Sequence, residues 1–451
     1  MNDTIVGIST AVGIGAISIV RISGENSISI ANSIFKGKDL TKIKTHTITY
    51  GHIIDNDTII DEVLVSIMRA PSTYTMEDVV EINCHGGIAT TKKILEILLT
   101  KGCRLAEPGE FTKRAFLNGR IDLIEAEGVM DLINAKTDQA REVAINQVSG
   151  KVTSLIRDIR QDLIEILANI EVNIDYPEYE DIEQVTNEIL IPKIKSAKSK
   201  INKILNESEN GKLIKEGIKT VIIGRPNVGK SSLLNKLIEE DKAIVTDIAG
   251  TTRDIVEGTL NLDGILLNII DTAGIRETTD KVEKIGVDKS ISLIEKADLI
   301  LFMLNNNEEL TQDDLDILKK TENKNTIIIV NKTDLTQKID INKLNKKNIV
   351  YMSLENNVGL DHLKDEIIKL FNLEKITQAD LTYLTNARSI AILKNNLESI
   401  KNIEEGIQNK IPVDIVGIDI KQIWSNLGEI IGETYKEELI DQLFSQFCLG
   451  K

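Results

Sequence analysis

The sequence contains little cysteine and few aromatic side chains. Its 451 residues include three cysteines, Cys84, Cys103 and Cys448, and no CxxC pair. This count argues against a disulfide framework and a structural zinc site, and it suits a reducing cytosol. Aromatic residues make up 3% of the chain and hydrophobic residues 41%. The hydrophobic cores must therefore be built mainly from Ile, Leu and Val.

The sequence also lacks long apolar runs and an excess of basic residues. It has no uninterrupted stretch of about 18 apolar residues, and its first four residues lack the basic region of a signal peptide. We therefore expect a soluble, cytoplasmic protein without a membrane segment. Because 70 acidic residues outnumber 54 basic ones, the formal net charge is -16. Any contact with RNA must then come from a local basic patch and not from the field of the whole protein.

The length and the hydrophobic periodicity indicate several domains, since one core rarely organises so long a chain. Residues 1–118 combine strand-like runs with a helical segment and predict a mixed α/β domain. Residues 119–215 and 380–451 have apolar residues at three- and four-residue steps, typical of bundle helices. Residues 216–379 alternate short apolar strands with amphipathic helices, which predicts a doubly wound parallel sheet. The expected fold is multidomain, α/β plus all-α, with an α/β domain inserted into a helical domain.

The same patterns locate individual elements. Residues 90–100 have the spacing of an amphipathic helix, and helices are also predicted over residues 390–407 and 420–447. A long helix should end at Asp175, because proline at position 177 disfavours helix in the residue before it. Strands are predicted at residues 16–22, 45–54, 62–68, 79–83, 219–224, 265–271, 299–304, 326–331 and 349–353.

Residues 224–231 read GRPNVGKS and fit the pattern GxxxxGK[ST] of a phosphate-binding loop. They lie between a predicted strand and a predicted helix, as such a loop must. Glycines let backbone N–H groups approach phosphate oxygens, and the helix N-terminus adds a favourable dipole. Lys230 should reach the β- and γ-phosphates, and Ser231 should offer its hydroxyl to Mg²⁺.

Two further segments complete the predicted phosphate and metal site. Residues 271–274 read DTAG at the end of the next long apolar strand. Asp271 would hold Mg²⁺ through water, and the N–H of Gly274 would face the γ-phosphate. Residues 251–254 read TTRD in a polar loop that fits switch I, where Thr252 would close the Mg²⁺ shell. Ile275 follows the DTAG where many GTPases have Gln, so another group must orient the attacking water.

Residues 331–334 read NKTD and indicate which base is bound. Asp334 can accept two hydrogen bonds from N1–H and N2–H of guanine, a donor pair that adenine lacks. A site built for such polar pairing can reject the analogue by ~10⁴-fold or more. Ser353, after the following strand, would back the base. The sequence therefore predicts a GTP-hydrolysing enzyme.

With these motifs placed, the sequence closely resembles the MnmE/TrmE family of tRNA wobble-uridine modification GTPases over essentially its whole length. The resemblance includes the inserted GTPase domain, and the family usually has Ile where Leu449 stands. It implies an N-terminal domain that binds folate and mediates dimerisation. Four segments outside the GTPase domain carry the resemblance: residues 20–24 (VRISG), 81–87 (EINCHGG), 107–112 (EPGEFT) and 447–451 (FCLGK).

The resemblance implies a defined activity. A homodimer would work with an FAD-containing partner, in a heterotetramer, to add a carboxymethylaminomethyl-class group to C5 of the wobble uridine of certain tRNAs. The one-carbon unit would come from a tetrahydrofolate in the 5,10-methylene or 5-formyl form. Arg21, Glu81, Arg120 and Lys451 would contact the folate. The family often has Lys in place of Arg120, which keeps the charge but changes the donor geometry.

The resemblance also implies activation by K⁺. Asn227 and the backbone of Thr246, Ile248 and Thr251 would coordinate this ion beside the phosphates. A cation held there could replace an arginine finger by offsetting charge that develops in the transition state.

Three residues are implied as catalytic. Lys230 would act on the phosphates, and Glu283 matches the water-orienting acid of the family, a role that Ile275 cannot fill. Cys448 is either a reactive-site group or a plain tail thiol, and the resemblance favours the first. The motifs and the resemblance together imply GTP contacts from Asn227, Val228, Gly229, Lys230, Ser231, Ser232, Thr246, Asp247, Ile248, Ala249, Gly250, Thr251, Thr252, Asp271, Thr272, Ala273, Gly274, Asn331, Lys332, Asp334 and Ser353.

Some alternatives remain at this point. The chain could be a ribosome-assembly GTPase, a binding switch that catalyses only hydrolysis, although the N-terminal block and the FCLGK tail favour RNA modification. The pair Cys84 and His85 could bind a metal, although shaping a turn beside two glycines is the favoured interpretation. Five lysines on one predicted helix form either a solvated face, which is favoured, or a tRNA contact: Lys193, Lys195, Lys198, Lys200 and Lys203.

Overall fold

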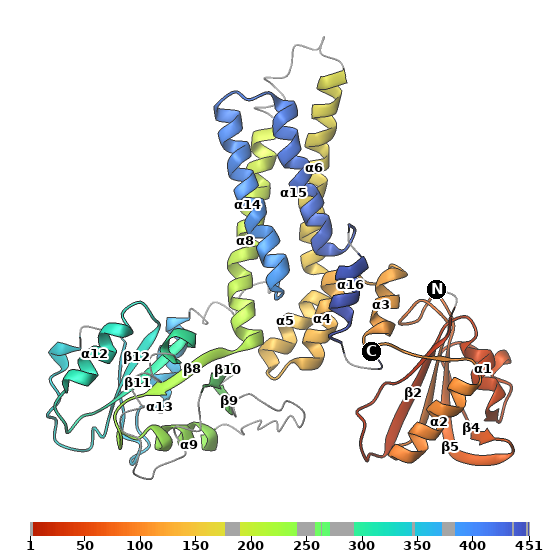
Figure 1. Cartoon of the computed structure of the whole chain (residues 1–451), viewed down its shortest axis with the longest axis horizontal. Coiled ribbons are helices and arrows are strands. Elements are labelled where there is room, and N and C mark those ends of the chain that lie inside the picture. Colours follow the sequence, from red (N-terminus) through yellow and green to blue (C-terminus); the bar gives the residue numbers. More distant parts are fainter. Residues whose placement is uncertain are drawn as a thin grey trace. The chain divides into compact units, whose positions relative to one another are not determined.

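The chain divides into two compact units (Figure 1). The first comprises residues 1–130, 147–200 and 391–451, and the second residues 131–146 and 201–390. The domain boundaries predicted after residues 118, 215 and 379 stay a proposal. The computed structural model describes residues 3–175, 190–240, 258–262, 264–270, 293–344, 348–371, 384–434, 437–447 and 450.

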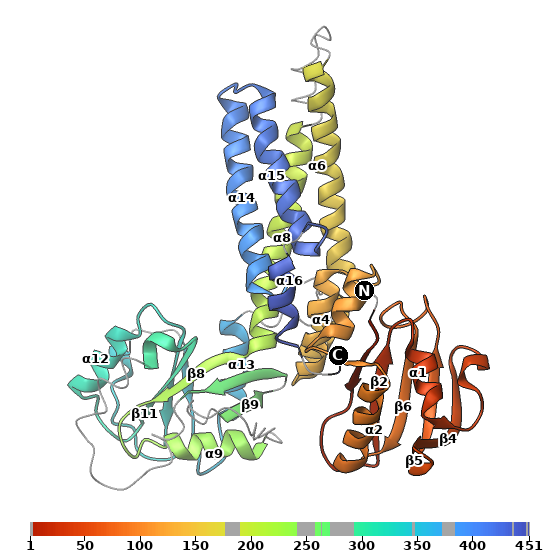
Figure 2. The ribbon, with the colours of Figure 1, turned by 45° about the vertical axis from the view of Figure 1, so that its right-hand side comes forward.

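The first unit contains a seven-stranded sheet in the order β3-β4-β5-β6-β2-β1-β7. Its neighbouring strands are antiparallel except β7, which pairs parallel with β1. Helices α1 and α2 cover one face of this sheet with a shared aliphatic core (Figure 2). The elements are β1 (Ile5–Ile8), β2 (Ile17–Ser23), α1 (Ser27–Ser33), β3 (Phe35–Lys36), the 3-10 helix η1 (Leu40–Lys42), β4 (Thr47–Asp55), β5 (Thr58–Met68), β6 (Val79–His85), α2 (Ile88–Thr100), β7 (Arg104–Leu105) and α3 (Glu110–Leu117).

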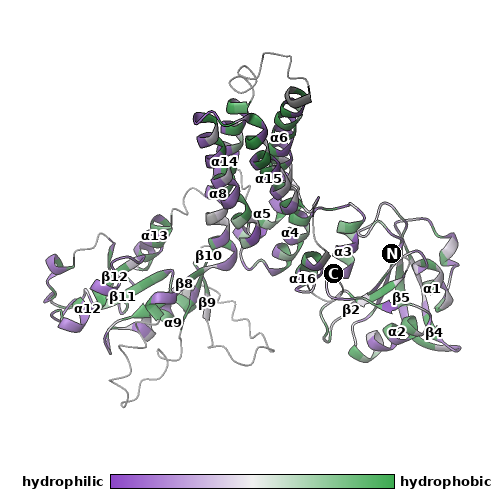
Figure 3. Cartoon of the chain, turned by 45° about the horizontal axis from the view of Figure 1, so that its top comes forward, coloured by the Kyte–Doolittle hydropathy of each residue, from purple (hydrophilic) through white to green (hydrophobic). Residues whose placement is uncertain are grey.

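Long helices follow the sheet in the sequence. They have hydrophobic and hydrophilic residues on different faces (Figure 3), and α6 packs against α15. Helix α6 is described as far as Asp175, and the residues after it lie outside the described part of the chain, so the predicted helix end stays a prediction. The helices are α4 (Leu123–Asn134), α5 (Asp138–Val148), α6 (Lys151–Asp175), α8 (Ile191–Glu216), α14 (Ala387–Gln408), α15 (Val413–Ile431) and α16 (Glu437–Phe444).

The second unit contains a six-stranded sheet in the order β13-β12-β11-β8-β10-β9. All its neighbouring strands are parallel except β9, which pairs antiparallel with β10. Aliphatic cores lie on both faces of the sheet, as expected for a doubly wound fold. The elements are β8 (Ile218–Ile223), α9 (Lys230–Glu240), β9 (Gly258–Leu262), β10 (Ile265–Ile269), β11 (Leu299–Asn305), α12 (Gln312–Lys320), β12 (Thr326–Asn331), the 3-10 helix η3 (Ile341–Lys343), β13 (Ile349–Tyr351) and α13 (Leu360–Leu370).

The predicted combination of α/β and helical parts is confirmed, and each predicted strand is present within a few residues. Strands β1, β3, β7 and β9 and helix α1 were not predicted. Strands β3 and β7 have only two residues each, too few to show an alternating pattern. The helical pattern predicted over residues 420–447 is divided between α15 and α16, because α15 ends at Ile431 and Gly432 follows with φ of 76°. Among the described residues, no helix is both long and apolar enough to cross a membrane.

Candidate functional site

The predicted phosphate-binding loop follows β8 and leads directly into α9, which begins at Lys230. Gly224 has φ of 146°, and a Cβ there would lie 2.4 Å from the carbonyl oxygen of Met303. Gly229 has φ of 104°, and a Cβ there would lie 2.5 Å from Nδ2 of Asn331. Glycine is required at both positions because other residues lack the space and rarely adopt this conformation. The loop therefore has the close backbone turn that a phosphate group needs.

The side chain of Lys230 lies inside this loop. Its Nζ donates hydrogen bonds to the carbonyl oxygens of Gly224 and Arg225, each at 2.8 Å. Burial lowers the pKa of Lys230, because desolvation disfavours the charged form. A bound phosphate would supply the negative charge that this buried ammonium lacks. The arrangement fits a nucleoside triphosphate.

The NKTD segment contacts the phosphate loop although the two are about a hundred residues apart in sequence. Asn331 ends β12 and donates from Nδ2 to the carbonyl oxygen of Val228 at 2.8 Å. Lys332 donates from Nζ to the carbonyl oxygen of Asn227 at 3.0 Å. Two residues of the NKTD segment thus donate hydrogen bonds to the backbone of the phosphate-binding loop. The structure brings the phosphate and base motifs into one site.

Asp334 and Ser353, both assigned to the base site from the sequence, are in contact in the structure. Ser353 follows β13, and its Oγ donates to Oδ1 of Asp334 at 2.5 Å. Asp334 is otherwise exposed, so its second carboxylate oxygen can face a ligand. The hydroxyl fixes the orientation of the carboxylate, which prepares it for the paired donors of guanine.

Arg225 contributes to the phosphate loop in a way that its sequence did not reveal. Its guanidinium pairs with Asp314 at 3.1 Å and with Glu308 at 3.2 Å. Asp314 is fully buried and belongs to a capping box with Thr311 at the start of α12. Only the Thr-x-x-Asp spacing of that box was visible in the sequence. The pair connects the phosphate loop to α12.

Several predicted site residues lie outside the part of the chain that the structure describes. These are the DTAG segment, the switch I segment with four of the metal ligands named from the sequence, the water-orienting acid and two tail residues. The residues concerned are Thr246, Asp247, Ile248, Ala249, Gly250, Thr251, Thr252, Asp271, Thr272, Ala273, Gly274, Glu283, Cys448 and Lys451.

A second cluster lies on the N-terminal sheet. Arg21 on β2 and Glu81 on β6 are direct cross-strand neighbours, with Nε and Oε1 2.8 Å apart. The Arg21 guanidinium also lies 6.0 Å from the ring centre of Tyr74 and 5.5 Å from that of Phe111. Arg120 lies 4.8 Å from the Tyr74 ring and donates to the Tyr74 carbonyl oxygen at 2.9 Å. Two residues predicted from the resemblance thus contact Tyr74, which sequence reasoning missed, and the third, Glu81, pairs with one of them.

A buried arginine holds the segment that carries Tyr74. Arg114 on α3 is 1% exposed and pairs with Asp3 at 2.7 Å and with Glu77 and Glu110 at 3.1 Å. Charged groups are rarely this buried unless they are paired. Because Glu77 lies three residues after Tyr74, this network limits how far the Tyr74 ring can move.

The C-terminal tail reaches this cluster. The carbonyl oxygen of Gly450 accepts hydrogen bonds from Ser9 at 2.9 Å and from Arg21 at 3.4 Å. Gly450 has φ of 85°, and a Cβ there would lie 2.0 Å from the carbonyl oxygen of Ile8. Only glycine fits this approach. Gly450, which belongs to the family-like FCLGK segment, therefore lies beside Arg21.

Cys84 and His85 do not form a joint metal site. Cys84 is 2% exposed and faces the core, and burial raises the pKa of its thiol. His85 bonds through Nδ1 to Asp61 at 2.7 Å, and this carboxylate raises the pKa of His85. Adjacent residues of a strand point to opposite faces, so the two side chains diverge. The described residues contain no group of three or more His, Cys, Asp or Glu side chains that could hold a metal ion.

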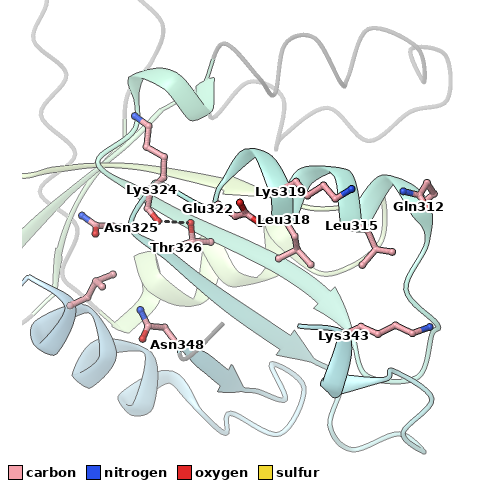
Figure 4. A pocket seen from close by; sticks show the side chains of 11 residues that line it. Gln312, Leu315, Leu318, Lys319, Glu322, Lys324, Asn325, Thr326, Lys343 and Asn348 are labelled. Atoms are coloured by element: carbon pink, nitrogen blue, oxygen red, sulfur yellow. Dashed lines mark hydrogen bonds between the residues drawn. The ribbon is translucent and has the colours of Figure 1, made fainter. Parts of the chain in front are cut away.

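A cavity of ≈ 900 Å³ lies in the second unit beside α12 (Figure 4). Leu315, Leu318 and Lys319 line it from α12, and Thr326 lines it from the start of β12. The NKTD segment begins at Asn331, at the other end of the same strand. The cavity is therefore not the nucleotide site, and it contains none of the residues predicted from the motifs.

Comparison with known proteins gives consistent matches over the whole chain. A family model described as MnmE helical domain matches residues 123–448, and one described as GTP-binding protein TrmE N-terminus matches residues 4–120. The tRNA modification GTPase MnmE of Bacillus cytotoxicus is 55% identical over 455 residues, covering 100% of this chain and 99% of its own. The protein of the same description from Bacillus cereus (strain ATCC 10987 / NRS 248) is 56% identical with the same coverage.

Solved structures match a smaller part of the chain. The G domain of the FeoB iron transporter of T. maritima is 26% identical and aligns with a TM-score of 0.26. The alignment covers 34% of this chain and 98% of that domain. The assignment of family depends on the full-length relatives and not on this match.

Proposed function

Since the chain belongs to the MnmE/TrmE family of tRNA modification GTPases, we propose that it modifies C5 of the wobble uridine. In this proposal the chain hydrolyses GTP and, with an FAD-containing partner, adds an aminomethyl-type group of the carboxymethylaminomethyl class. The cluster of Arg21, Glu81 and Arg120 beside the docked tail carries the proposal, because hydrolysis alone does not require it. No observation favours a ribosome-assembly GTPase.

Folate fits the cluster on the N-terminal sheet. A tetrahydrofolate, in the 5,10-methylene or 5-formyl form, supplies the one-carbon unit when bound. Arg21, Arg120 and Glu81 offer charged groups to a pterin–glutamate ligand. Because Arg21 and Glu81 are paired at 2.8 Å, they would contact the same part of it. The Tyr74 ring offers an apolar face between the two guanidinium groups. Lys451 would add a further charge from the tail.

We expect Arg21→Ala to weaken the binding of 5-formyltetrahydrofolate to the full-length chain by at least about tenfold. The reason is that a hydrogen bond to a charged group contributes about 1.5–3 kcal/mol. Isothermal titration calorimetry without GTP measures the change. Arg21→Lys should bind with intermediate affinity, because it keeps the charge and loses the planar fork. Lys101→Ala, an exposed lysine elsewhere in the same domain, is the control; equal affinities for Arg21→Ala and the wild type would show that Arg21 is not a folate ligand.

The open face of the N-terminal sheet suits a homodimer. Ile48 and Tyr50 on β4 are 67% and 58% exposed, and Leu64 on β5 and Ile17 on β2 are 46% and 61% exposed. These side chains are on the face opposite the core that contacts α1 and α2. Monomeric proteins rarely expose an apolar patch of this kind. We propose that the same face of a second copy covers it, in a two-fold symmetric contact.

The GTPase step is assigned to residues around the phosphate loop. Lys230 would contact the β- and γ-phosphates, and Ser231 with Thr252 would hold Mg²⁺. Asn227 with the backbone oxygens of three switch I residues would hold K⁺. Glu283 would orient the attacking water. The glycine turn and the buried Lys230 ammonium support this assignment on the loop side. The remaining K⁺ ligands in the proposal are Thr246, Ile248 and Thr251.

The modification step should be separable from hydrolysis, and this separation tests the proposed function. Cells that lack the gene should lack the modified wobble nucleoside, measured by mass spectrometry of digested tRNA. The wild-type gene should restore it, whereas Cys448→Ser should not, because a reactive tail thiol is replaced by a much weaker nucleophile. Purified Cys448→Ser should keep wild-type GTP turnover. An unchanged nucleoside profile in the deletion strain would refute the proposed function, and full restoration by Cys448→Ser would refute only the role of this residue.

A further inference from the structure

One edge of the N-terminal sheet concentrates positive charge in a strongly acidic chain. Four lysines lie within nine residues, at β3 and in the segment that leads to β4, and all four are exposed. The half-buried Arg69 at the end of β5 adds a fifth positive charge. The chain as a whole has a net charge of -16, so this edge is a local exception. We call it the basic edge and define it as Lys36, Lys38, Lys42, Lys44 and Arg69.

The backbone that carries the basic edge is firmly anchored. Leu40 is fully buried in the sheet core, and its N–H donates to Oδ1 of Asn32 at 2.8 Å. Arg69 donates from Nη2 to the carbonyl oxygens of Thr41 at 2.7 Å and Ile43 at 3.3 Å. The lysines therefore project from a fixed framework. A fixed array loses less conformational entropy when it binds a ligand.

Acidic side chains compensate little of this charge. Asp39 is the one acidic residue among positions 36–44, and it already accepts hydrogen bonds from the backbone and side chain of Thr41 and pairs with Lys42 at 3.1 Å. Within the described part of the chain, no ion pair is formed by Lys36, Lys38 or Lys44. Their positive charges are available to a ligand.

Three of the five lysines in the α8 series behave differently, whereas Lys195 and Lys203 are exposed. Lys193 pairs with Glu165 and Asp162, and Lys200 pairs with Asp162 at 2.9 Å. Lys198 pairs with Glu404 at 2.5 Å. These contacts agree with a solvated helix face, which was the favoured interpretation of the lysine series. They leave the basic edge as the better candidate for an anion surface.

We propose that the basic edge binds the phosphate backbone of tRNA. The proposal rests on the proposed function, which supplies an RNA substrate but not the surface that contacts it. Lysine ammonium groups neutralise phosphates and release counterions, and such contacts position an RNA without reading its sequence. Protein–protein interfaces are depleted in lysine, so the lysine-rich composition of the edge favours RNA over an acidic protein.

The test uses the full-length chain with all four lysines of the basic edge changed to alanine. We expect tRNA affinity, measured by fluorescence anisotropy, to fall by at least about tenfold at moderate salt. The slope of log affinity against log salt should become shallower by about 3, because each phosphate contact contributes about 0.7–0.9 to the magnitude of this slope. Replacing the same lysines with arginine should preserve both quantities. GTP turnover and folate binding should stay at wild-type values, since neither candidate site contains these residues.

A charge-matched variant separates the edge from the general field of the protein. It changes four exposed lysines scattered over other elements to alanine, so that its net charge equals that of the edge variant. Equal losses of affinity in the two variants would overturn the proposal, as would wild-type affinity and salt slope in the edge variant. So would an edge variant that keeps tRNA binding and loses only a protein partner. A deletion strain with normal wobble nucleosides would instead refute the proposed function, whatever the anisotropy shows. The control positions are Lys101, Lys151, Lys320 and Lys421.

Discussion

Asp334→Asn is expected to change the nucleotide preference of the enzyme from GTP to xanthosine triphosphate. Ser353 donates to Oδ1 of Asp334, and it can donate equally to the amide oxygen of an asparagine. The asparagine Nδ2 then takes the place of the second carboxylate oxygen. This nitrogen is a donor, so it cannot form a hydrogen bond with the N2–H donors of guanine, but it can donate to the 2-oxo group of xanthine. The change therefore reverses one hydrogen bond without removing the one that orients the side chain.

The expected loss of GTP affinity is large. Polar sites can discriminate by ~10⁴-fold or more when a buried partner is left unpaired, and the exposure of Asp334 places the expected effect below that limit, at about a hundredfold. Competition titration with labelled nucleotides measures both affinities. Asp365→Asn on α13 removes an exposed carboxylate of the same unit and should leave them unchanged. A GTP preference that survives Asp334→Asn would remove the argument for guanine recognition.

The second large effect concerns potassium. Turnover of GTP should be at least about tenfold faster in KCl than in NaCl at equal ionic strength. The cation would replace an arginine finger, and such a finger accelerates hydrolysis by about 10³–10⁵-fold. Asn227 lies in the phosphate loop with an exposed side chain, and its carbonyl oxygen is held by Lys332. Its side-chain oxygen can therefore serve as a ligand while its backbone stays fixed. Na⁺ is too small to fill the same oxygen cage without distortion.

Variants of Asn227 test this mechanism. Asn227 has φ of 61°, which alanine adopts with strain, so Asn227→Gly is the better variant because glycine adopts it freely. Both variants should lose most of the K⁺ stimulation and still bind GTP through Lys230 and Asp334. Glu283→Ala should bind GTP normally and hydrolyse it slowly in either salt. Equal wild-type rates in KCl and NaCl would contradict the cation mechanism and leave the GTPase assignment intact.

The sequence by itself determined the elements and the chemistry that depend on short stretches of chain. The spacing of glycines and Lys230 identified the phosphate loop, because a tight turn and a helix start are local requirements. The predicted strand at residues 326–331 matches β12, since a continuous β-branched run bounded by polar residues specifies a buried strand. Each of these features depends on residues that lie close together in the sequence.

Only the tertiary structure decided which of these pieces meet. Arg225 and Asp314 are far apart in sequence, and nothing local to either predicts their pairing. The contact of Gly450 with Arg21 spans 429 residues. Tyr74 becomes part of the cluster only because β2 and the turn after α3 place Arg21 and Arg120 against its ring. The difference between Lys193, which is paired, and Lys36, which is not, also depends on neighbouring elements. Periodicity and local backbone preferences are properties of short segments, whereas ion pairs and binding clusters depend on which faces pack together, and packing is decided by the whole chain.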